Sequence, residues 1–524
     1  MKASSFIDEL LAEQQQLTAV ERFAQRHVAN RESEDPIYRE LIPLERPRPG
    51  EQYAFQVDLD LCTGCKACVS ACHSLNGLDE DETWRAVGLL HGGSPETPYQ
   101  QTVTSACHHC VDPACLNGCP VLAYEKDETT GIVHHLDDQC IGCQYCVLKC
   151  PYDVPKYSSK RGIVRKCDLC HSRLAVGEAP ACAQACPSSA ITIQIASQDS
   201  VRRASAAPHA RLLPGSFPSG YTLPATNYVS SQPIPENCRP ANVNASRPEP
   251  AHWPLVWMLV FTQMASGAFL SGSISFILDE SSCVDKAWFP LSVFGSTCLL
   301  AGLAASIFHL GRPLGAWRAL LGLRRSWMSR EILAFMLSAA AALGLINTHW
   351  HASFSTSSWM LVTSALGLVS VFCSGMIYVD TRRPAWVANN TFTRFFGTTL
   401  LLGATGTTTI LSWIGASASN STLRQSILLV GGVAIFLRTF LFIWESQMSS
   451  CATRYYQVPG LFRLQTGLFV LATFFGIAAL INHGLGAACL ATSSFLVTFT
   501  SRILERYEFF VTAATPRIPG TVAS

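Results

Sequence analysis

Sixteen of the 22 cysteines in this 524-residue chain lie between Cys62 and Cys186, in four groups of four. Within a group the cysteines are separated by two to four residues, apart from one interval of eleven residues in the fourth group. The groups are Cys62-x2-Cys65-x2-Cys68-x3-Cys72, Cys107-x2-Cys110-x4-Cys115-x3-Cys119, Cys140-x2-Cys143-x2-Cys146-x3-Cys150 and Cys167-x2-Cys170-x11-Cys182-x3-Cys186. Three cysteines two residues apart form a tight loop that directs three thiolates at one metal cluster. This half of the protein is therefore predicted to fold around metal clusters.

The third group, with the proline that follows it, matches the bacterial ferredoxin pattern completely, and the other groups are variants of it. Structural zinc usually uses two CxxC pairs separated by a longer stretch, which only the fourth group resembles. A disulfide framework requires an oxidising compartment. We expect no export, because residues 1–30 lack the basic start and the uninterrupted apolar run of a signal peptide. Since every group keeps four cysteines, four [4Fe–4S] clusters are predicted.

Beyond Trp253 the sequence consists of apolar runs about as long as the hydrocarbon core of a bilayer requires. We count eight runs, at 254–278, 288–309, 331–347, 358–379, 395–416, 426–444, 464–482 and 485–501. A soluble core cannot explain eight such runs, so this half is predicted to span a lipid bilayer. The net charge of +1 offers no field that would attract nucleic acid, which is not expected as a partner.

Arginines collect in the predicted loops after the second, fourth and sixth spans and in the tail, whereas the opposite loops offer only Lys286 and Arg424. The arginines counted are Arg312, Arg318, Arg324, Arg325, Arg330, Arg382, Arg383, Arg394, Arg454, Arg463, Arg502, Arg506 and Arg517. The positive-inside rule then predicts that these loops, both termini and the cysteine-rich half lie on the cytoplasmic side of a bacterial plasma membrane.

Residues 53–195 resemble the iron–sulfur subunit of the dimethyl sulfoxide reductase family of molybdopterin oxidoreductases. The segments Cys140-Ile-Gly-Cys-Gln-Tyr-Cys-Val-Leu-Lys-Cys-Pro and Cys107-His-His-Cys carry the resemblance. It implies two ferredoxin-like halves, in which the first group pairs with the fourth and the second with the third. The implied ligand sets are Cys62, Cys65, Cys68 and Cys186; Cys72, Cys167, Cys170 and Cys182; Cys107, Cys110, Cys115 and Cys150; and Cys119, Cys140, Cys143 and Cys146. The sequence departs from the family at His73, where a proline often follows the first group.

The segment 308–333 resembles the eight-helix anchor subunit of the same family, which binds menaquinol without haem. The resemblance implies that His309 and Glu331 serve the quinol site. The residues support this independently, because both are predicted at the cytoplasmic boundary and quinol oxidation requires acceptors for two protons. The alternative is that they are ordinary interfacial residues of a helix hairpin, with Glu331 paired to Arg330 or Arg325. No haem is expected, because no two histidines occupy facing mid-membrane positions.

Several other residues carry weaker expectations. His108 and His109 are expected to form hydrogen bonds or to pack near a cluster rather than to bind metal. Arg438 lies inside the sixth span and either faces the bundle interior or extends toward Glu445. Few buried charges in the spans argue against an ion path. A basic stretch is expected to be a solvated face or a docking surface for a catalytic partner; it comprises Lys156, Lys160, Arg161, Arg165 and Lys166.

The predicted fold class is an α+β double-ferredoxin-like iron–sulfur domain followed by an all-α membrane bundle of about eight helices. The predicted parts are an N-terminal amphipathic helix and extension (1–50), the four-cluster domain (51–196), a linker (197–252), the quinol-binding anchor (253–505) and a tail (506–524).

The resemblance implies an electron-transfer and anchor subunit, without a substrate-reducing site of its own. It would carry electrons from the quinone pool to a separate molybdopterin-containing catalytic subunit, a terminal reductase. The alternatives are reverse flow from a formate- or hydrogen-oxidising partner, service to an assimilatory nitrate reductase, and a membrane redox sensor.

Overall fold

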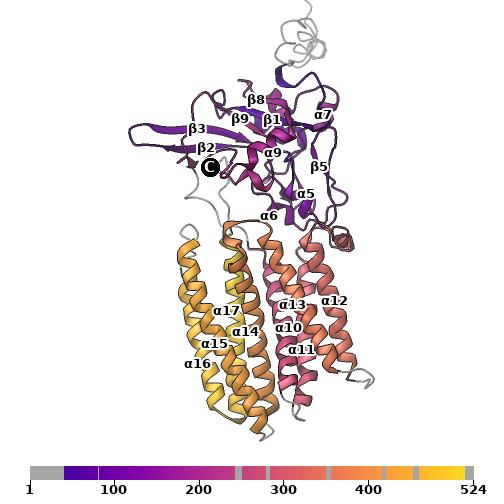
Figure 1. Ribbon diagram of the computed structural model, residues 1–524, viewed down its shortest axis with the longest axis vertical. Helices are drawn as coiled ribbons and strands as arrows, with labels where there is room; N and C mark the ends of the chain where they lie inside the picture. The colour runs from indigo at the N-terminus through magenta and orange to yellow at the C-terminus, as the bar shows by residue number, and fades with distance from the viewer. Residues whose placement is uncertain are drawn as a thin grey trace, which may run out of the picture.

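The computed structural model describes residues 40–80, 82–241, 251–278, 284–349, 356–415, 421–452 and 460–513. The predicted N-terminal amphipathic helix, from Ser5 to His27, lies outside these residues. The cysteine-rich half forms one unit that sits on the end of a bundle of long helices (Figure 1). This arrangement confirms the prediction of an α+β domain followed by an all-α bundle.

Small sheets and short helices build the cysteine-rich half. A three-stranded sheet has the order β8-β1-β9, a second has the order β10-β2-β3, and two hairpins pair β4 with β5 and β6 with β7. The strands are β1 (Glu51–Asp58), β2 (Ala86–Gly93), β3 (Pro98–Ser105), β4 (Tyr124–Lys126), β5 (Val133–His135), β6 (Lys156–Ser158), β7 (Ile163–Arg165), β8 (Ile191–Ser197), β9 (Asn227–Val229) and β10 (Arg239–Pro240). The short helices are α4 (Ala67–Asn76), α5 (Ala114–Gly118), α6 (Tyr145–Lys149), α7 (His171–Ala175), α8 (Ala181–Gln184) and α9 (Gln198–Ala206).

The described part of the predicted linker, up to residue 241, is folded onto the cluster domain. It forms α9, a 3₁₀ turn at Ser219–Tyr221, and the two strands β9 and β10, which extend the sheets through β1 and β2. Strands of two or three residues have no periodicity that a sequence could reveal. The segment therefore satisfies the hydrogen bonds of exposed sheet edges although its sequence looks irregular.

Eight long helices follow in the described part of the protein. They are α10 (Trp253–Leu278), α11 (Val284–Ile307), α12 (Trp327–Asn347), α13 (Thr356–Val379), α14 (Ala388–Gly415), α15 (Ser421–Ala452), α16 (Leu461–Ile481) and α17 (Gly484–Val511). Seven of them are long and apolar enough to cross a membrane. The eighth, α14, is rich in threonine and has most of its residues buried among the other helices, so its surface does not need to be apolar throughout.

Within the predicted spans few charges are buried: among the described residues these are Glu331 and Arg438. The helices α14 and α17 extend beyond the predicted apolar runs and include charged residues that the sequence pattern assigned to loops. The buried charged residues of the long helices, apart from Glu331, are Arg394, Arg438, Arg502, Glu505 and Arg506. A helical turn at the end of an apolar run cannot be told from a loop by hydropathy, which explains why the sequence pattern did not assign these residues to helices.

The two halves meet through an extensive polar contact. Tyr145 of α6 donates its hydroxyl to the oxygen of Ile377 at 3.1 Å, and Lys149 binds a carboxylate oxygen of Asp380 at 2.6 Å. The segment between α11 and α12 approaches the cluster domain so closely that a side chain on Gly311 would collide with the backbone of Gly162. These contacts fix one end of the bundle against the cysteine-rich half.

Candidate cluster and quinol sites

Two of the cysteine groups fold into the same local loop. Lys66 and Gln144, each directly after the second cysteine of its group, are left-handed with φ of 63° and 58°. Gly64 and Gly142, each directly before that cysteine, also have positive φ. The turn then enters α4 or α6, whose first residues carry the third cysteine. The spacing predicts this loop, because only a tight turn brings three thiols to one point.

In the structure, the cysteines lie near other cysteines of the four sets that the family resemblance implies, and thiols of neighbouring sets also approach one another. Set 1 is Cys62, Cys65, Cys68 and Cys186, set 2 is Cys72, Cys167, Cys170 and Cys182, set 3 is Cys107, Cys110, Cys115 and Cys150, and set 4 is Cys119, Cys140, Cys143 and Cys146. Each set takes its fourth cysteine from a distant group. The ligand assignment, with the exchange between groups that two-cluster ferredoxin units require, stays a prediction.

The thiols within a set disfavour one another's ionisation. Burial, with a smaller contribution from the thiols of Cys182 and Cys170, raises the pKa of Cys72 to about 12. Burial likewise raises the pKa of Cys119 and of Cys150 to about 11. Among the described side chains, no three of His, Cys, Asp and Glu come close enough to hold a single metal ion. Buried thiols with this wider spacing fit a polynuclear iron cluster, whose positive charge favours thiolates.

Two buried cations, which the sequence analysis did not single out as such, lie between the sets. Arg85 donates Nη1 to Thr104 at 3.2 Å; although burial opposes its charge, nearby thiolates of sets 1 and 2 raise its pKa. Lys166 has its Nζ 3.8 Å from the sulfur of Cys107 in set 3 and donates to the oxygen of Cys167 in set 2 at 2.8 Å. In the sequence, the sign that Lys166 lies close to a set of cysteines is that it directly precedes Cys167.

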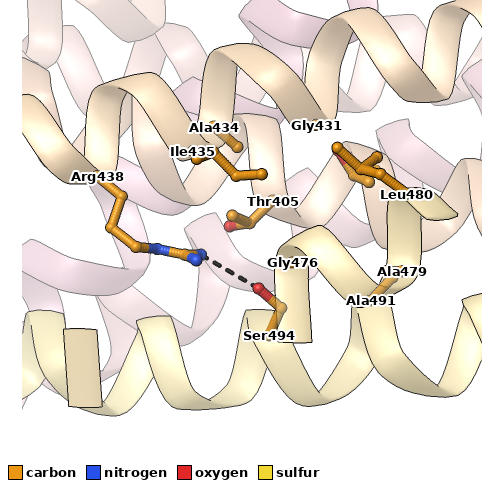
Figure 2. Close-up of a pocket in the computed structure, with 11 residues that line it drawn as sticks. Thr405, Gly431, Ala434, Ile435, Arg438, Gly476, Ala479, Leu480, Ala491 and Ser494 are labelled. Atoms are coloured by element: carbon orange, nitrogen blue, oxygen red, sulfur yellow. Dashed lines mark hydrogen bonds between the residues drawn. The ribbon is translucent and has the colours of Figure 1, made fainter. Parts of the chain in front are cut away.

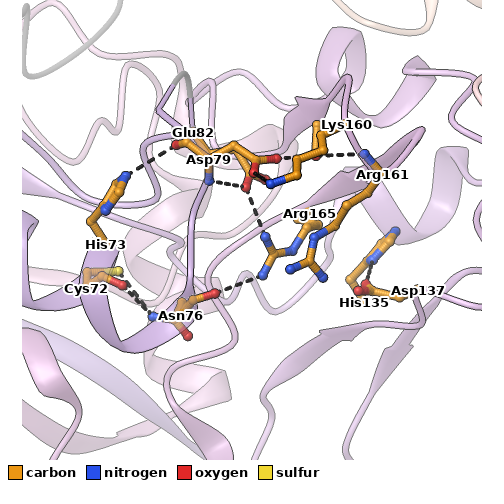
Figure 3. Close-up of polar contacts among 11 residues, drawn as sticks. Cys72, His73, Asn76, Asp79, Glu82, His135, Asp137, Lys160, Arg161 and Arg165 are labelled. Carbon is orange, nitrogen blue, oxygen red and sulfur yellow. Dashed lines mark hydrogen bonds and ion pairs between the residues drawn. The ribbon is translucent and has the colours of Figure 1, made fainter.

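The fold does not present the predicted basic stretch as one exposed surface. Arg165 is buried and forms an ion pair with Glu82 at 2.9 Å, in a group of polar contacts that also includes Lys160 and Arg161 (Figure 3). Lys166 is buried between sets 2 and 3. Lys160 remains largely exposed, at 83%. Arg165 and Lys166 belong neither to a solvated face nor to a docking surface, because β7 ends at Arg165 and both side chains are buried.

His73, where the sequence departs from the family pattern, forms a hydrogen bond in the structure. Its Nε2 donates to the oxygen of Asp79 at 3.3 Å (Figure 3). Asn76, one turn further along α4, donates to the oxygen of Cys72 at 2.8 Å and lies 3.6 Å from its sulfur. Hydrogen bonds thus hold the turn after the first group, where a proline often stands in the family.

His108 and His109 form hydrogen bonds, as expected. The Nδ1 of His108 lies 2.8 Å from the hydroxyl of Thr226, and the Nδ1 of His109 accepts from the backbone of Val133 at 3.1 Å. Burial lowers the pKa of both rings, to about 3 for His108, so both are neutral. They stabilise the loop of the second group without a charge.

The four sets follow one another toward the membrane helices. Cys68 of set 1 lies near Cys182 of set 2, and Cys167 of set 2 lies near Cys107 of set 3. Tyr124 lies near thiols of both set 3 and set 4. Set 4 adjoins the segment between α11 and α12, where the backbone of Arg312 donates to the oxygen of Ile141 at 3.0 Å. Cys65, at the other end of the series, is exposed.

His309 lies in the turn just after α11, not at the end of the helix. Its Nε2 donates to the oxygen of Cys143 in set 4 at 3.2 Å, and its ring packs edge-on against His252 at a centroid distance of 5.0 Å. Burial, assisted by His252, lowers the pKa of His309 to about 4. The neutral ring, with its proton on Nε2, leaves Nδ1 unprotonated as a hydrogen-bond acceptor.

Glu331 lies in the second turn of α12 and is only 5% exposed. It lies near Tyr145 of α6, which directly precedes Cys146 of set 4, and near Ser374 of α13. Among the described residues of this region, no ion pair joins Glu331 to Arg325 or Arg330. Arg330 instead donates to the oxygens of Leu323 and Arg324. The hairpin ion pair that would have made Glu331 purely structural does not form.

Two family profiles match the two halves of the protein. Residues 99–196 match a family described as "4Fe-4S dicluster domain". Residues 249–511, about half of the sequence, match a family described as "DMSO reductase anchor subunit (DmsC)". The second match covers all eight long helices and the segment with His309 and Glu331.

Known proteins are similar to the first half. The B subunit of the anaerobic dimethyl sulfoxide reductase of Haemophilus influenzae is 38% identical over 146 residues, which cover 26% of this chain and 71% of that protein. The formate dehydrogenase-O iron-sulfur subunit of Escherichia coli is 34% identical over 169 residues, 29% of this chain and 56% of that protein. The hydrogenase-2 operon protein HybA of Escherichia coli O157:H7 is 36% identical over 171 residues, which cover 28% of this chain and 52% of that protein. The chain is a member of the dimethyl sulfoxide reductase family, and it joins an iron–sulfur domain similar to that B subunit to a membrane anchor of the DmsC type in one polypeptide.

Proposed function

We propose that this chain conducts electrons from quinol, most simply menaquinol, through four [4Fe–4S] clusters to a separate molybdopterin-containing reductase. The cysteines of sets 1 to 4 would hold the clusters, and His309 and Glu331 would receive the quinol. The observation that carries the proposal is the unbroken series of sets, which ends against the candidate quinol residues through the hydrogen bond from His309 to Cys143.

When bound, each cluster would supply a centre that gains and loses one electron at a time. The residues of the protein supply the remaining requirements. Glu331, buried and without an ion pair, offers a carboxylate that can accept one quinol proton, and the free Nδ1 of His309 offers an acceptor for the other. The hydrogen bond to Cys143 orients the ring, and Tyr145 fixes set 4 against α13. Proton acceptance and electron transfer would therefore occur side by side.

Orientation is part of the same proposal. Arg312 and Arg318 bind the backbone oxygens of Asp137 and Asp138 at the boundary between the halves, so the arginine-rich face of the bundle is the face that carries set 4. The positive-inside rule assigns that face to the cytoplasm. Protease added to sealed inverted vesicles should digest the cluster domain, whereas right-side-out vesicles should protect it; the reverse result would contradict the orientation.

The test uses the full-length protein in liposomes that contain menaquinol, with cluster reduction followed by electron paramagnetic resonance. The protein should contain about sixteen iron atoms, the content of four cubes. Glu331→Gln and His309→Asn should slow quinol-driven reduction roughly 100-fold, the usual size of a lost acid–base contribution. Reduction by dithionite should remain unchanged, because the clusters stay intact.

Met336→Leu serves as the matched control for Glu331→Gln, because Met336 lies on the same helix and is exposed. It should leave both rates at the wild-type value. Equal quinol-driven rates in wild type, Glu331→Gln and His309→Asn would refute the quinol site but not the cluster assignment.

A second direction of flow is supported by one finding. The formate dehydrogenase-O iron-sulfur subunit is similar to the cluster domain. In that direction a dehydrogenase would load the clusters, and Glu331 and His309 would deliver protons to quinone. Purification of the tagged protein from solubilised membranes, with molybdenum measured and the large partner assayed with sulfoxides and with formate, decides between the two.

A further inference from the structure

Arg438 of α15 is a buried guanidinium with unused donors. It is 5% exposed, and its Nη2 donates to the hydroxyl of Ser494 on α17 at 3.2 Å (Figure 2). The same nitrogen donates to the hydroxyl of Thr498 on α17 at 2.6 Å. Its Nε and Nη1 have no acceptor among the described residues. Buried polar groups in proteins are almost always hydrogen-bonded, so two orphaned donors on one charged group require an explanation.

Small cavities lie on both sides of this guanidinium. The first has a volume of about 20 Å³, and small side chains create it (Figure 2); they include Gly431, Ala434, Gly476, Ala479, Ala491 and Ser494. The second has a volume of about 10 Å³ and lies toward Phe469, Ala472 and Ser501. Spaces of this size hold a water molecule or a small ion, not a ring.

Among the described side chains, none is seen to neutralise the charge of Arg438. The described charged residue that acts on it is another cation, Arg502, and the side chain of Glu445 lies outside the described residues. The buried carboxylate of Glu505 is engaged elsewhere, with Arg394 at 3.0 Å and Arg506 at 3.5 Å. Water in the cavities would satisfy the donors but would leave a net positive charge in a medium of low dielectric constant.

The site is too deep for a lipid headgroup. With a rise of 1.5 Å per residue, Ser494 lies about 15 Å from the start of α17 and Thr498 about 20 Å from its end. Both hydroxyls are therefore near the middle of a bilayer core about 30 Å thick. A phosphate at the membrane surface does not reach this level.

We propose that Arg438 binds a small monovalent inorganic anion, of the size of chloride, in the cavities between α14, α15, α16 and α17. The free donors would bind the anion while Ser494 and Thr498 hold the guanidinium from the other side. The anion would supply the negative charge that no described carboxylate supplies here. The site is separate from the residues proposed for quinol and does not depend on that function.

Two variants test separately the charge of Arg438 and the cavity beside it. Arg438→Gln removes the cation. Gly476→Ala keeps the cation but adds a methyl group 3.4 Å from Nη1, where the anion would lie, and it tests the site even if Arg438→Gln does not fold. Gly432→Ala is the matched control, because Gly432 lies on α15 with open space around it.

The measurement is thermal unfolding of the full-length protein in detergent, with chloride replaced by the bulky anion gluconate at constant ionic strength. Wild type and Gly432→Ala should be stabilised by chloride in a saturable manner. Arg438→Gln and Gly476→Ala should need at least about tenfold more chloride, the loss expected for a charged hydrogen bond. In crystals grown with bromide, an anomalous peak should lie beside Nη1 in wild type and vanish in Gly476→Ala.

Equal stability in chloride and gluconate, together with no bromide peak, would overturn the proposal and leave water as the occupant. A chloride effect of the same size in all four proteins would also overturn it, because the anion would then bind elsewhere.

Discussion

Buried cations of the two halves can have opposite surroundings. In the cluster half, Arg85 and Lys166 lie beside the thiols of neighbouring sets, so each of these cations has a place for negative charge next to it. In the membrane half, Arg394 and Arg506 pair with Glu505, but Arg438 has hydroxyls as its described partners and is affected by another arginine, Arg502. Because a buried cation without an anion is costly, its surroundings indicate what is missing. In the first half they fit thiolate-bound clusters, and in the second a mobile anion.

The largest expected effect tests whether the sets are correct. Cys119 belongs to the second cysteine group in sequence but to set 4 in space, whereas Cys150 belongs to the third group but to set 3. Cys119→Ala should therefore remove the same cluster signal as Cys140→Ala, with the loss of about four iron atoms per protein. Quinol-driven reduction of the remaining clusters should fall at least about 100-fold, because set 4 is the link to the membrane.

Cys238→Ser is the control for this prediction. Cys238 is buried like the set cysteines but lies near Gly92, outside all four sets. Its substitution should leave iron content and all cluster spectra unchanged. If Cys119→Ala removed the signal that Cys150→Ala removes, the assignment of sets 3 and 4 would be wrong.

A smaller effect tests the role of the cations between sets. Lys166→Met should lower the midpoint potentials of the clusters in sets 2 and 3, because a nearby positive charge favours the reduced state. One charge about 4–8 Å from a cluster, at an effective dielectric constant of about 20, shifts a one-electron potential by on the order of 100–200 mV. Redox titration with electron paramagnetic resonance measures the shift. Arg85→Gln should act on sets 1 and 2 in the same direction.

Lys160→Met is matched to Lys166→Met, because it removes the same charge from an exposed position in the same basic stretch. Water and salt screen such a charge, so the potentials should move little. Equal shifts in the two variants would mean that net charge, not the place of Lys166 between the sets, sets the potentials.

Much of the fold follows from the sequence because its strongest patterns are local. The CxxCxxC loops bring thiols to one point, and the apolar runs match the apolar core of a bilayer. In the part of the chain that the structure describes, the expected loops and eight long helices lie close to the expected positions. The break between α16 and α17 lies at Asn482 and His483, as the pattern predicted. The matched families confirm the kind of domain in each half.

The parts that could not be predicted depend on contacts between distant segments. Nothing near Arg165 in sequence shows that Glu82 will be its partner, and nothing near Arg394 shows that Glu505 will be. The same applies to the edge strands β9 and β10, whose partners come from a segment more than 100 residues earlier. The ligand roles of the 16 cysteines, His309 and Glu331 remain predictions until iron and quinol are measured.

The smallest expected effect concerns a third kind of buried cation, one whose anion comes from the other half of the protein. Lys149 of α6 has its side chain 5% exposed and binds Asp380, which follows α13. In Asp380→Asn, Lys149 would be a buried cation without a carboxylate partner, as Arg438 is among the described residues. Because Asp380 is itself one-third exposed, solvent offsets part of the loss, and the free energy of unfolding should fall by only about 1–2 kcal/mol.

The measurement is chemical or thermal unfolding of the full-length protein, with Asp199→Asn as the control, since Asp199 is exposed on α9. The control should match wild type. If anion binding is a general remedy for orphaned cations in this protein, chloride should restore part of the lost stability in Asp380→Asn. An equal loss in chloride and in gluconate would show that an orphaned positive charge alone does not bind an anion in this protein.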